Sequence, residues 1–526
     1  MSEPLVLGLE FSTQSAKAVA LGVESGIRVA VYQLSYDESF PHYRTTGGVL
    51  PGQHPEVRHT SPAMLLEALD ELFRRMRADG LDLAQVRALK LDAQQHCTVY
   101  ADESITERLA GLSATEPLTE QLTAAFTRAT APIWEDRSTE REARLLEERL
   151  AGYGGIQKLT ANRAELRFPA SQILKWARQD PAAYDRSAHI MLLSAFLTSV
   201  LTGRPAPADT GDGWGTNLNC TNISEPGWDE TVLAVMDEEI RAADATSTLQ
   251  EKLGEMRHYD TPVGIVSPYF AKVYGLNADA VVLAGTGDNP ATLLGCGGNL
   301  VISLGSSYTV NGILADLAHL EDAEYNVFGY VPHHAMALSV ITNGTKVHDE
   351  FRRRYSHDGS WENYATLAGP RAVTPEDPLL LPYLQEESVP LRPAGIMRDG
   401  FGEDEAMLNV RGLHLSQALS LRLHASHVTD PESLAVVGGG SFNERLRTFI
   451  TDAFGAQTYR IRDGEYAAPL GCAVAAARYV LDTDYEEAVT RFVQAEEDSR
   501  LEPRADYGGI YEKLLTRYAD LEAGTG

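Results

Sequence analysis

The sequence predicts an α/β protein with two related domains, and three observations support this. Apolar β-type runs alternate with amphipathic helical stretches along most of the 526 residues, as in sheets covered by helices. A buried-type strand at 434–437 runs into three glycines and then a helix over 443–454 that ends at Gly455. Two strand–turn–strand segments share one layout, with Leu5 of the first matching Leu300 of the second. We therefore expect domains at 1–297 and 298–526 that share a ligand cleft.

The individual elements follow from local patterns. A helix is predicted over 62–77 because its apolar residues recur on one face. Thr139 and Glu142 form a capping-box pattern, which predicts a helix that continues through Leu150. The apolar run 190–201 is too short to span a bilayer and predicts a core helix. Further strands are predicted over 6–9, 16–21, 86–91, 280–284, 300–304 and 309–314.

Composition narrows the classes of function. Asp and Glu outnumber Lys and Arg by 74 to 45, a net charge of −29 that repels nucleic acid and anionic lipid. We therefore expect neither nucleic acid nor a membrane as partner. An anionic substrate would need a local pocket that is cationic or filled by a metal ion, and a divalent cation fits this requirement. The N-terminus has no basic leader, and the four cysteines have neither disulfide-framework nor zinc spacing, so a reducing cytoplasm is expected. The sequence leaves a homodimer open.

The two repeated segments carry turns of Gly, Ser, Thr and Gln between strands. Such turns expose several backbone N–H groups in one place, which is what binding a phosphate requires. Each segment alone is also compatible with an ordinary β-hairpin. Because one lies near the start of each half, we interpret them as two phosphate-binding hairpins.

Six short segments, taken in their order along the chain, resemble the FGGY carbohydrate kinases of the actin-like ATPase (ribonuclease H-like) fold, and within that family the xylulose kinases. The resemblance covers nearly the whole chain and implies ATP-dependent phosphorylation of a ketopentose such as D-xylulose. The segments are 10–15, 94–96, 133–139, 286–290, 303–307 and 438–443.

The resemblance implies that Asp288 is the catalytic base. Its residue context agrees, because Asp288 follows an apolar strand, and ligands of α/β folds bind at the carboxyl ends of strands. The alternative from the residues alone is a surface turn in which Asp288 caps a helix. Glu10 and Asp288 are the expected Mg²⁺ ligands. The family carries aspartate at the position of Glu10, so the side chain is one methylene longer here.

The remaining expected contacts are divided between ATP and the sugar. The resemblance implies that ATP and its phosphates are bound by Ser12, Thr13, Gln14, Gly305, Ser306, Ser307, Trp361, Gly439, Gly440 and Asn443. It implies that the sugar is bound by Gln95, His96, Asp136, Arg163, Arg167 and Asn289. Neutral amides and imidazole suit a polyol, because they bind hydroxyls without the cost of desolvating a charge.

Several alternatives stay open at this level. Either Arg163 or Arg167 is the arginine that reaches the sugar. Asp136 either contacts the sugar or forms an ion pair with Arg137. Asn443 is compatible with a helix cap as well as a ribose or adenine contact, and Trp361 with core packing. The chain as a whole is also compatible with a kinase for another ketose or polyol, a weakly active binding protein, or a nucleotide-dependent conformational module.

Overall fold

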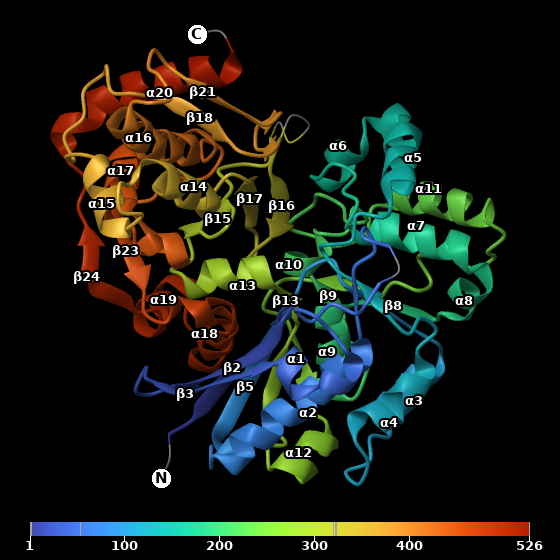
Figure 1. The fold of residues 1–526 in the computed structure, drawn as a ribbon. Coiled ribbons are helices and arrows are strands. Elements are labelled where there is room, and N and C mark those ends of the chain that lie inside the picture. Colours follow the sequence, from blue (N-terminus) through green and yellow to red (C-terminus); the bar gives the residue numbers. More distant parts are fainter. Residues whose placement is uncertain (1–2, 53, 319, 321–322, 525–526) are drawn as a thin grey trace. The chain divides into compact units, whose positions relative to one another are not determined.

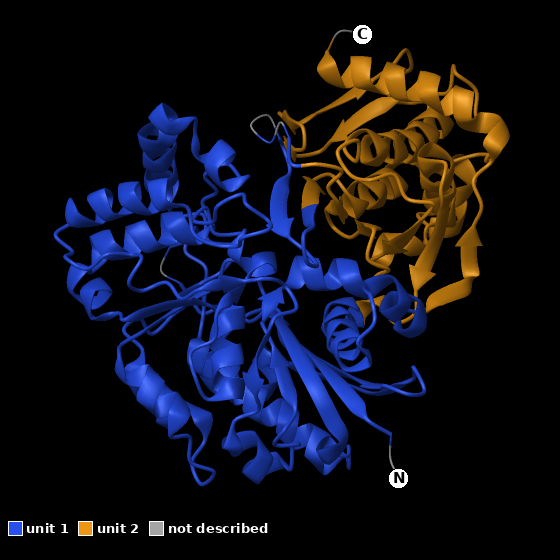
Figure 2. Cartoon of the chain, turned by 180° about the vertical axis from the view of Figure 1, so that it is seen from behind, with its two compact units in different colours: residues 1–295, 317–336, 466–493 blue, residues 296–316, 337–465, 494–526 orange. Residues whose placement is uncertain are grey.

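The computed structural model describes residues 3–52, 54–318, 320 and 323–524. It consists of two compact units, which Figure 2 shows in different colours. Unit 1 comprises residues 1–295, 317–336 and 466–493, and unit 2 comprises residues 296–316, 337–465 and 494–526. Each unit therefore gathers segments that are distant in sequence, and the assignment of one domain to the sugar and the other to the nucleotide stays a prediction.

The main sheet of unit 1 is built around β1, whose residues are all buried. β1 pairs antiparallel with β2 and parallel with β5 (Figure 1). In spatial order the strands are β11 (Pro262–Ile265), β12 (Val281–Leu283), β5 (Val86–Ala93), β1 (Leu5–Phe11), β2 (Ser15–Gly22) and β3 (Arg28–Ser35), and β13 (Thr286–Gly287) also pairs with β5.

A second sheet repeats this topology. Six of its seven strands run in the order β17 (Ala335–Ile341), β15 (Tyr308–Ile313), β14 (Leu300–Leu304), β22 (Ser433–Val437), β23 (Gln457–Ile461) and β24 (Ala495–Leu501). In both sheets an antiparallel hairpin is followed by two parallel neighbours and an antiparallel edge strand. The repeat predicted from Leu5 and Leu300 is thereby confirmed at the level of strand order.

Short strand pairs and helices complete unit 1. The pairs are β4 (His59–Thr60) with β7 (Ala131–Pro132), β6 (Thr98–Ala101) with β8 (His189–Leu192), and β9 (Ala208–Asp209) with β10 (Met256–Arg257). The helices are α1 (Tyr36–Ser39), α2 (Pro62–Ala78), α3 (Ser104–Ala110), α4 (Leu118–Leu122), α5 (Glu140–Leu150), α6 (Ile156–Thr160), α7 (Pro169–Gln179), α8 (Pro181–Arg186), α9 (Leu193–Thr202), α10 (Thr210–Gly213), α11 (Glu230–Arg241), α12 (Pro268–Tyr274), α13 (Asp288–Gly295), α18 (Ala467–Leu481) and α19 (Tyr485–Phe492). β16 (Asn326–Gly329) lies in the same unit.

Unit 2 carries fewer helices, and two small hairpins accompany them. The helices are α14 (Thr345–Tyr355), α15 (Trp361–Leu367), α16 (Ala406–Leu423), α17 (Glu444–Phe454) and α20 (Gly508–Ala523). The hairpins pair β18 (Leu380–Tyr383) with β21 (Gly395–Arg398) and β19 (Glu387–Ser388) with β20 (Leu391–Arg392). None of the helices among the described residues has the length and apolar character that a membrane crossing requires.

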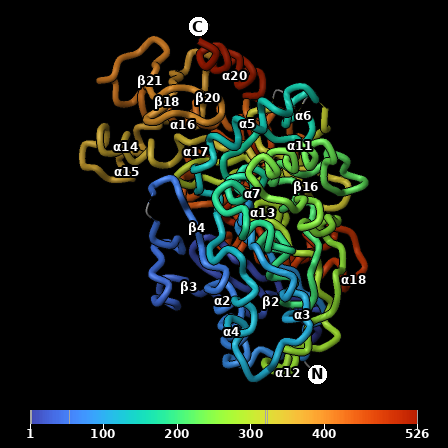
Figure 3. The backbone as a smooth tube through the Cα atoms, turned by 90° about the vertical axis from the view of Figure 1, so that its right-hand side faces the viewer, coloured from blue at the N-terminus to red at the C-terminus, as the bar shows by residue number. Residues whose placement is uncertain are grey.

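The amphipathic pattern of α2 produces the expected packing. Its apolar face is buried, and its Phe73 ring lies 5.0 Å from the ring of Phe270 on α12. On the same helix, Asp70 accepts hydrogen bonds from the hydroxyls of Tyr269 and Tyr274, each at 2.8 Å. Figure 3 shows α2 with α4 and α12 close beside it. Ring packing and hydrogen bonds from α2 thus hold α12 in place.

Two local predictions are wrong in detail. Thr139 precedes α5, but its side chain makes no capping bond, because its hydroxyl donates to the carbonyl of Leu166 instead. The run 190–201 begins as strand β8 and becomes helix α9 only at Leu193. By contrast, α17 begins and ends as predicted, with Asn443 accepting a hydrogen bond from the Leu446 N–H and Gly455 in the left-handed conformation.

Helix α13, which begins at Asp288, packs backbone to backbone against α18. A Cβ added at Gly471 would lie 1.9 Å from the carbonyl oxygen of Ala291, and one at Gly295 would lie 1.8 Å from that of Ala467. On the other side, a Cβ at Gly8 of β1 would lie 1.8 Å from the carbonyl oxygen of Pro469. These glycines let α18, from near the C-terminus of the chain, hold both β1 and α13.

We predict that Gly471→Ala lowers stability by about 2 kcal/mol, because the added methyl overlaps backbone that cannot rotate away. A loss of stability is informative, because replacing glycine by alanine inside a helix otherwise raises stability by about 1 kcal/mol. Gly508→Ala is the control, because nothing lies within 4 Å of a Cβ added there, at the first residue of α20. Thermal unfolding of both variants measures the effect, and equal midpoints would contradict the close packing.

Candidate functional site

Three carboxylates gather near the carboxyl ends of β1 and β5 in unit 1. Glu10 of β1 lies opposite Asp92 of β5, and Asp92 lies opposite Thr286 of β13, two residues before Asp288. Lys17 on β2 forms an ion pair with Glu10, with 2.9 Å between Nζ and Oε2. Asp92 was not among the predicted site residues, and its Oδ1 is buried without a hydrogen-bond partner among the described residues.

The electrostatics of this group favour protonated carboxyls. Burial, and then the charge of Glu10, raise the pKa of Asp288 to about 7. Burial raises the pKa of Glu10, although Lys17 opposes that shift. Burial raises the pKa of Asp92 well above its usual range, and Glu10 and Asp288 add to the effect. Asp288 therefore has the proton affinity that suits a general base near neutral pH.

A short chain of amides orients Asp288. The Asn289 amide nitrogen donates to Oδ1 of Asp288 at 3.1 Å and to Oε1 of Gln95 at 2.6 Å. The Gln95 amide nitrogen in turn donates to the carbonyl of Gly211 at 3.0 Å. Gln95 also needs Gly287, since a Cβ there would lie 2.5 Å from its Cγ. The structure thus brings together three of the predicted residues, Gln95, Asp288 and Asn289.

His96 is buried and held in one orientation. Its Nδ1 lies 2.7 Å from the carbonyl oxygen of Gly215, so Nδ1 carries the proton and donates it, and Nε2 keeps its lone pair. The ring stacks on Phe168 with 4.3 Å between centroids. Burial lowers the pKa of His96 to about 3, which keeps the imidazole neutral. The backbone at His96 has φ of 69°, a strained value that is common at functional sites.

The two candidate arginines differ in their surroundings. Arg167 donates to Oδ1 of Asn326 at 2.8 Å and lies 3.6 Å from a carboxylate oxygen of Glu165. Arg163 is exposed, and no hydrogen bond or ion pair engages it among the described residues. Asn162 joins this segment to β16, because its side chain donates to the Val327 carbonyl at 2.9 Å and accepts from the Val327 N–H at 2.8 Å. Arg163 is therefore the side chain that is available to a ligand.

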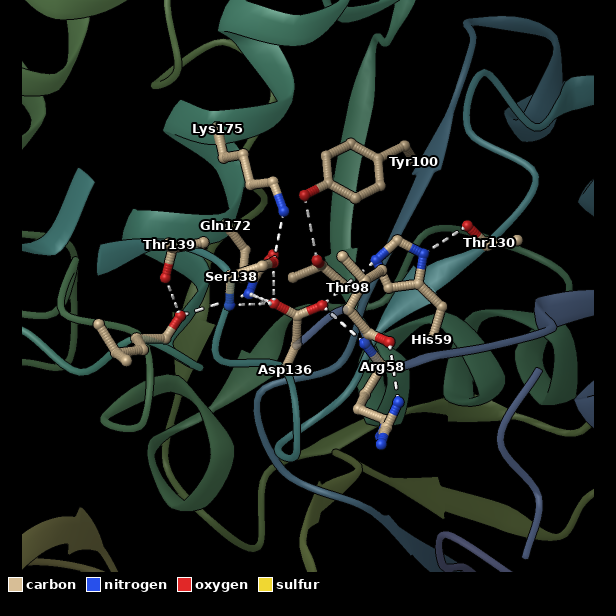
Figure 4. Close-up of polar contacts among 12 residues, drawn as sticks. Arg58, His59, Thr98, Tyr100, Thr130, Asp136, Ser138, Thr139, Gln172 and Lys175 are labelled. Carbon is tan, nitrogen blue, oxygen red and sulfur yellow. Dashed lines mark hydrogen bonds and ion pairs between the residues drawn. The ribbon is translucent and has the colours of Figure 1, made fainter. Parts of the chain in front are cut away.

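Asp136 lies at the centre of a polar cluster, which Figure 4 shows. Its carboxylate accepts from the backbone N–H groups of Arg58 (2.9 Å) and Ser138 (3.0 Å), from the Gln172 amide (2.8 Å) and from the Ser138 hydroxyl. His59 Nε2 lies 3.5 Å from its Oδ2, but burial lowers the pKa of His59 to about 4, so this imidazole is neutral near pH 7. The expected ion pair with Arg137 is wrong, because Arg137 is exposed and no ion pair joins it to Asp136 among the described residues. With its oxygens occupied, Asp136 is an organiser of the loop, and a sugar contact would have to displace one of these partners.

The first hairpin turn is closed by its own serines. Ser12 donates through both its N–H (3.0 Å) and its hydroxyl (2.9 Å) to the Ser15 carbonyl. Thr13 donates to the Gln94 amide oxygen at 3.3 Å and accepts from the Trp134 indole at 2.9 Å. Gln14 is exposed. The turn is therefore ordered, with the Gln14 side chain facing solvent.

Unit 2 contains a cavity of about 560 Å³ whose walls include the aromatic rings of Tyr308, Trp361, Tyr364 and Phe442. Trp361 is 50% exposed there and Phe442 is 72% exposed. Arginines cover one face of each ring, with the Arg352 guanidinium 4.9 Å from the Trp361 ring centre and that of Arg460 4.2 Å from the Phe442 ring centre. The full lining is Tyr308, Thr345, His348, Trp361, Tyr364, Ala365, Gly439, Gly440, Phe442, Asn443, Glu444, Arg445, Leu446 and Thr448.

A second cavity of about 600 Å³ shares Thr345, Trp361, Gly439 and Gly440 with the first. It is lined by the turn at Gly305 and Ser306 and by the first turn of α14, which carries Lys346. Ser307 lines neither cavity. Lys346 is exposed, and sequence reasoning missed it because a single lysine in a charged helix has no distinctive pattern.

Both polar atoms of the Asn443 side-chain amide have partners within the protein. Its oxygen accepts from the Leu446 N–H at 3.1 Å, and its nitrogen lies 3.1 Å from Nε2 of His414. His414 Nδ1 lies 2.7 Å from the Val410 carbonyl oxygen, so Nδ1 donates and Nε2 accepts from Asn443. His414 therefore fixes the orientation of a residue in the cavity wall.

The residues at the ends of β1 and β13 suit a magnesium ion by their chemistry. Mg²⁺ in phosphoryl-transfer sites is held by one or two carboxylates, several waters and the substrate phosphates. Glu10 and Asp288 supply two carboxylates, and the unpartnered Oδ1 of Asp92 adds a third acceptor beside them. Over the residues that the structure describes, no group of three or more His, Cys, Asp or Glu is arranged to hold a metal ion by itself.

Comparison with known proteins gives the class. Residues 5–295 match the N-terminal domain of the FGGY family of carbohydrate kinases, and the chain belongs to this family. It is an ATP-dependent carbohydrate kinase with the actin-like ATPase fold. A xylulose kinase from Mus musculus is 30% identical over 538 residues, covering 98% of this chain and 93% of that protein. Xylulose kinase 2 from Arabidopsis thaliana is 30% identical, covering 90% and 87%. The structure of a xylulose kinase from Rhodospirillum rubrum superposes with a TM-score of 0.80 at 15% identity, covering 99% and 98%.

The contacts of His414 predict a pH dependence of stability. Burial lowers its pKa to about 4, against about 6.5 in the unfolded chain. As pH falls below about 6.5, the unfolded state takes up a proton that the folded state refuses, so stability is lost progressively down to about pH 4. Between about pH 7 and about pH 5, we expect the unfolding free energy of His414→Gln to fall by about 2 kcal/mol less than that of wild type.

The comparison is between slopes, because the substitution itself changes stability. Unfolding is measured for wild type and His414→Gln at about pH 7, 6 and 5. Buried histidines that do not contact His414 contribute equally to both proteins and cancel. The measured difference includes the coupling to His348, whose ring centre lies 4.5 Å from that of His414. Parallel curves for the two proteins would show that His414 does not titrate in this way.

Proposed function

We propose that the chain transfers the γ-phosphate of ATP to D-xylulose, giving D-xylulose 5-phosphate. The observation that carries the proposal is the Asp288 carboxylate, which is oriented by Asn289 and has a pKa of about 7. The named relatives support the choice of sugar, since xylulose kinases match along 90% or more of the chain. Asp288 would take the proton of the hydroxyl that attacks the phosphorus in line.

On the sugar side, neutral groups would bind the hydroxyls. His96 offers the Nε2 lone pair to a hydroxyl donor, and its neutral ring avoids a desolvation penalty. We assign the arginine contact to Arg163, because Arg167 is engaged by Asn326. Gln95 acts by accepting a hydrogen bond from Asn289 and so holding its side chain in place. Asp136 acts by organising the loop that surrounds Asp136 itself.

On the nucleotide side, the aromatic cavity of unit 2 would take the base beside Trp361. Gly439 and Gly440 line both cavities, so the chain can approach the ligand closely where base and phosphates join. The turn at Gly305 and Ser306, with Lys346, would take the phosphates. The first hairpin, Ser12 to Gln14, is proposed to contact the transferring phosphate.

Mg²⁺ would be held by Glu10 and Asp288 together with the phosphates. When bound, it neutralises the charge that develops on the phosphate oxygens. We also propose that the protein resides in a reducing cytoplasm, which its four free thiols support. The homodimer stays a prediction.

A kinase for another ketose or a polyol is the second candidate, since changes in few side chains around a shared site alter specificity. The decisive experiment is a panel of pentuloses, hexuloses and polyols with ATP, followed by ADP release. D-Xylulose is expected to give the largest kcat/KM. A larger value for another acceptor would replace the substrate, and ADP release with none of them would indicate a protein that binds without turnover.

Asp288→Asn is expected to lower kcat by about 10²–10⁴-fold, because the amide cannot accept the proton. Affinity for ATP in the absence of Mg²⁺ should stay within about twofold, since the base cavity is built from other residues. Asp185→Asn is the matched control: this carboxylate accepts hydrogen bonds from Thr246 and Ser247 and belongs to neither candidate site. Steady-state turnover and calorimetric ATP titration give the two readouts. Turnover near the wild-type value in Asp288→Asn would remove Asp288 from the mechanism.

Trp361→Ala is expected to weaken ATP binding about tenfold, or about 1.4 kcal/mol, by removing one aromatic surface from the base. Tyr153→Ala is the control, because Tyr153 is an exposed aromatic residue that lines neither cavity. Calorimetry with ATP, ADP and adenosine should show the same loss for all three ligands. A loss confined to ATP would mean that Trp361 acts on the phosphates instead of the base.

A further inference from the structure

A lysine ammonium group is completely buried in the middle of β5. Lys90 has 0% exposure, and its Nζ donates to the carbonyl of Tyr259 at 2.5 Å and to that of Ala284. The same Nζ lies 4.0 Å from the centre of the Tyr259 ring. A buried ammonium is costly unless its donors are satisfied, so contacts of this kind have to be maintained together.

The third partner of Lys90 is an acidic residue that caps a short helix. Asp209 Oδ2 lies 3.7 Å from Lys90 Nζ, and both side chains are fully buried. Asp209 Oδ1 accepts from the Asp212 N–H at 2.8 Å and so holds the first turn of α10. Lys90 therefore reaches both the end of β12, through Ala284, and α10, through Asp209.

These two segments carry the groups that orient the proposed base. Ala284 is four residues before Asp288, and the intervening Gly285, Thr286 and Gly287 are all buried. α10 supplies the Gly211 carbonyl that accepts from Gln95. The segments also touch each other, since a Cβ at Gly211 would lie 2.2 Å from Oγ1 of Thr286 and 3.2 Å from Oδ2 of Asp209.

We propose that Lys90 is a positioning residue, which fixes the segment 284–288 against α10 and so sets the orientation of Asp288 and Gln95 for phosphoryl transfer. The inference rests on the proposed function. Lys90 acts through the Ala284 carbonyl and Asp209, and it does not contact the substrates. A displacement of about 1 Å at a reacting group can cost about 10²-fold in rate, so loss of this link should affect turnover.

The chain offers a matched control for the loss of a buried lysine. Lys252 is 4% exposed, donates to the Ser187 carbonyl at 2.5 Å and lies 4.7 Å from the centre of the Tyr184 ring. Lys252 thus resembles Lys90 in burial, in its carbonyl partner and in its aromatic neighbour, but it does not touch the segment before Asp288. Lys90→Met and Lys252→Met remove the same buried charge, and Lys90 differs in its second carbonyl acceptor and in its pairing with Asp209.

The test combines turnover with an observable that needs no activity. We expect both variants to lower the unfolding midpoint, but only Lys90→Met to lower kcat, by about 10²-fold with the KM for ATP within about twofold. Hydrogen exchange at the amides of 284–288 should be faster in Lys90→Met and unchanged in Lys252→Met. Equal effects of the two variants on kcat and on exchange would overturn the proposal and leave Lys90 a structural residue.

Two further outcomes are decided by the same design. If Lys90→Met does not fold, Asp209→Asn replaces it, because this substitution keeps the side-chain volume and removes the charge that pairs with Lys90. Faster hydrogen exchange at the amides of 284–288 and a lower kcat are again expected. Wild-type values for both would overturn the proposal. If wild type turns over no sugar, the proposed function fails. Hydrogen exchange then still decides whether Lys90 holds the segment.

Discussion

The burial of several carboxylates in one region is the constraint on which unit 1 depends. Glu10, Asp92, Asp209, Asp212 and Asp288 influence one another's pKa or share partners, and burial raises the pKa of each. Among the residues that the structure describes, two lysines pair with members of the group: Lys17 with Glu10 and Lys90 with Asp209. Because buried charge is costly, the packing of the strand ends has to keep each of these pairs intact. The rigidity that orients Asp288 is a consequence of the same requirement.

The two sheets share one topology but carry different chemistry at the same point of the repeat. Where β1 has Glu10, the matching position after β14 is Gly305. Where β5 carries Lys90 against Gly8, β22 carries the apolar Val437 against Ser303, and the residue two positions further on, at the place of Asp92, is Gly439. The first copy therefore concentrates acidic groups near a hydroxyl-rich turn. The second keeps the turn and lacks the acids, which suits an anionic ligand. A duplicated fold can divide base and phosphate chemistry in this way by changing few side chains.

Sequence patterns predicted what depends on neighbours along the chain and missed what depends on distant contacts. The strands of both hairpins, the cap at Asn443 and the end of α17 at Gly455 follow from local geometry and were found. The capping box at Thr139 failed because the Leu166 carbonyl, 27 positions away, takes the hydroxyl. Lys90 and Asp92 were overlooked as site residues because a charge inside an apolar run has no local explanation, and their partners lie more than a hundred positions away.

The chemistry of the two proposed ligands would account for the side chains at the proposed sites. A sugar is neutral, so amides and an uncharged His96 can bind its hydroxyls without desolvating charge. A nucleotide triphosphate is an anion, and it has to bind a chain of net charge −29. The cavity walls carry Lys346, Arg353 and Arg445 beside Asp349, Glu350 and Glu444, so the cations there balance the acidic groups. Backbone N–H groups of the glycine turns would then supply the attraction for an anion. The overall negative charge disfavours the binding of other polyanions, such as nucleic acid, that do not fit these cavities.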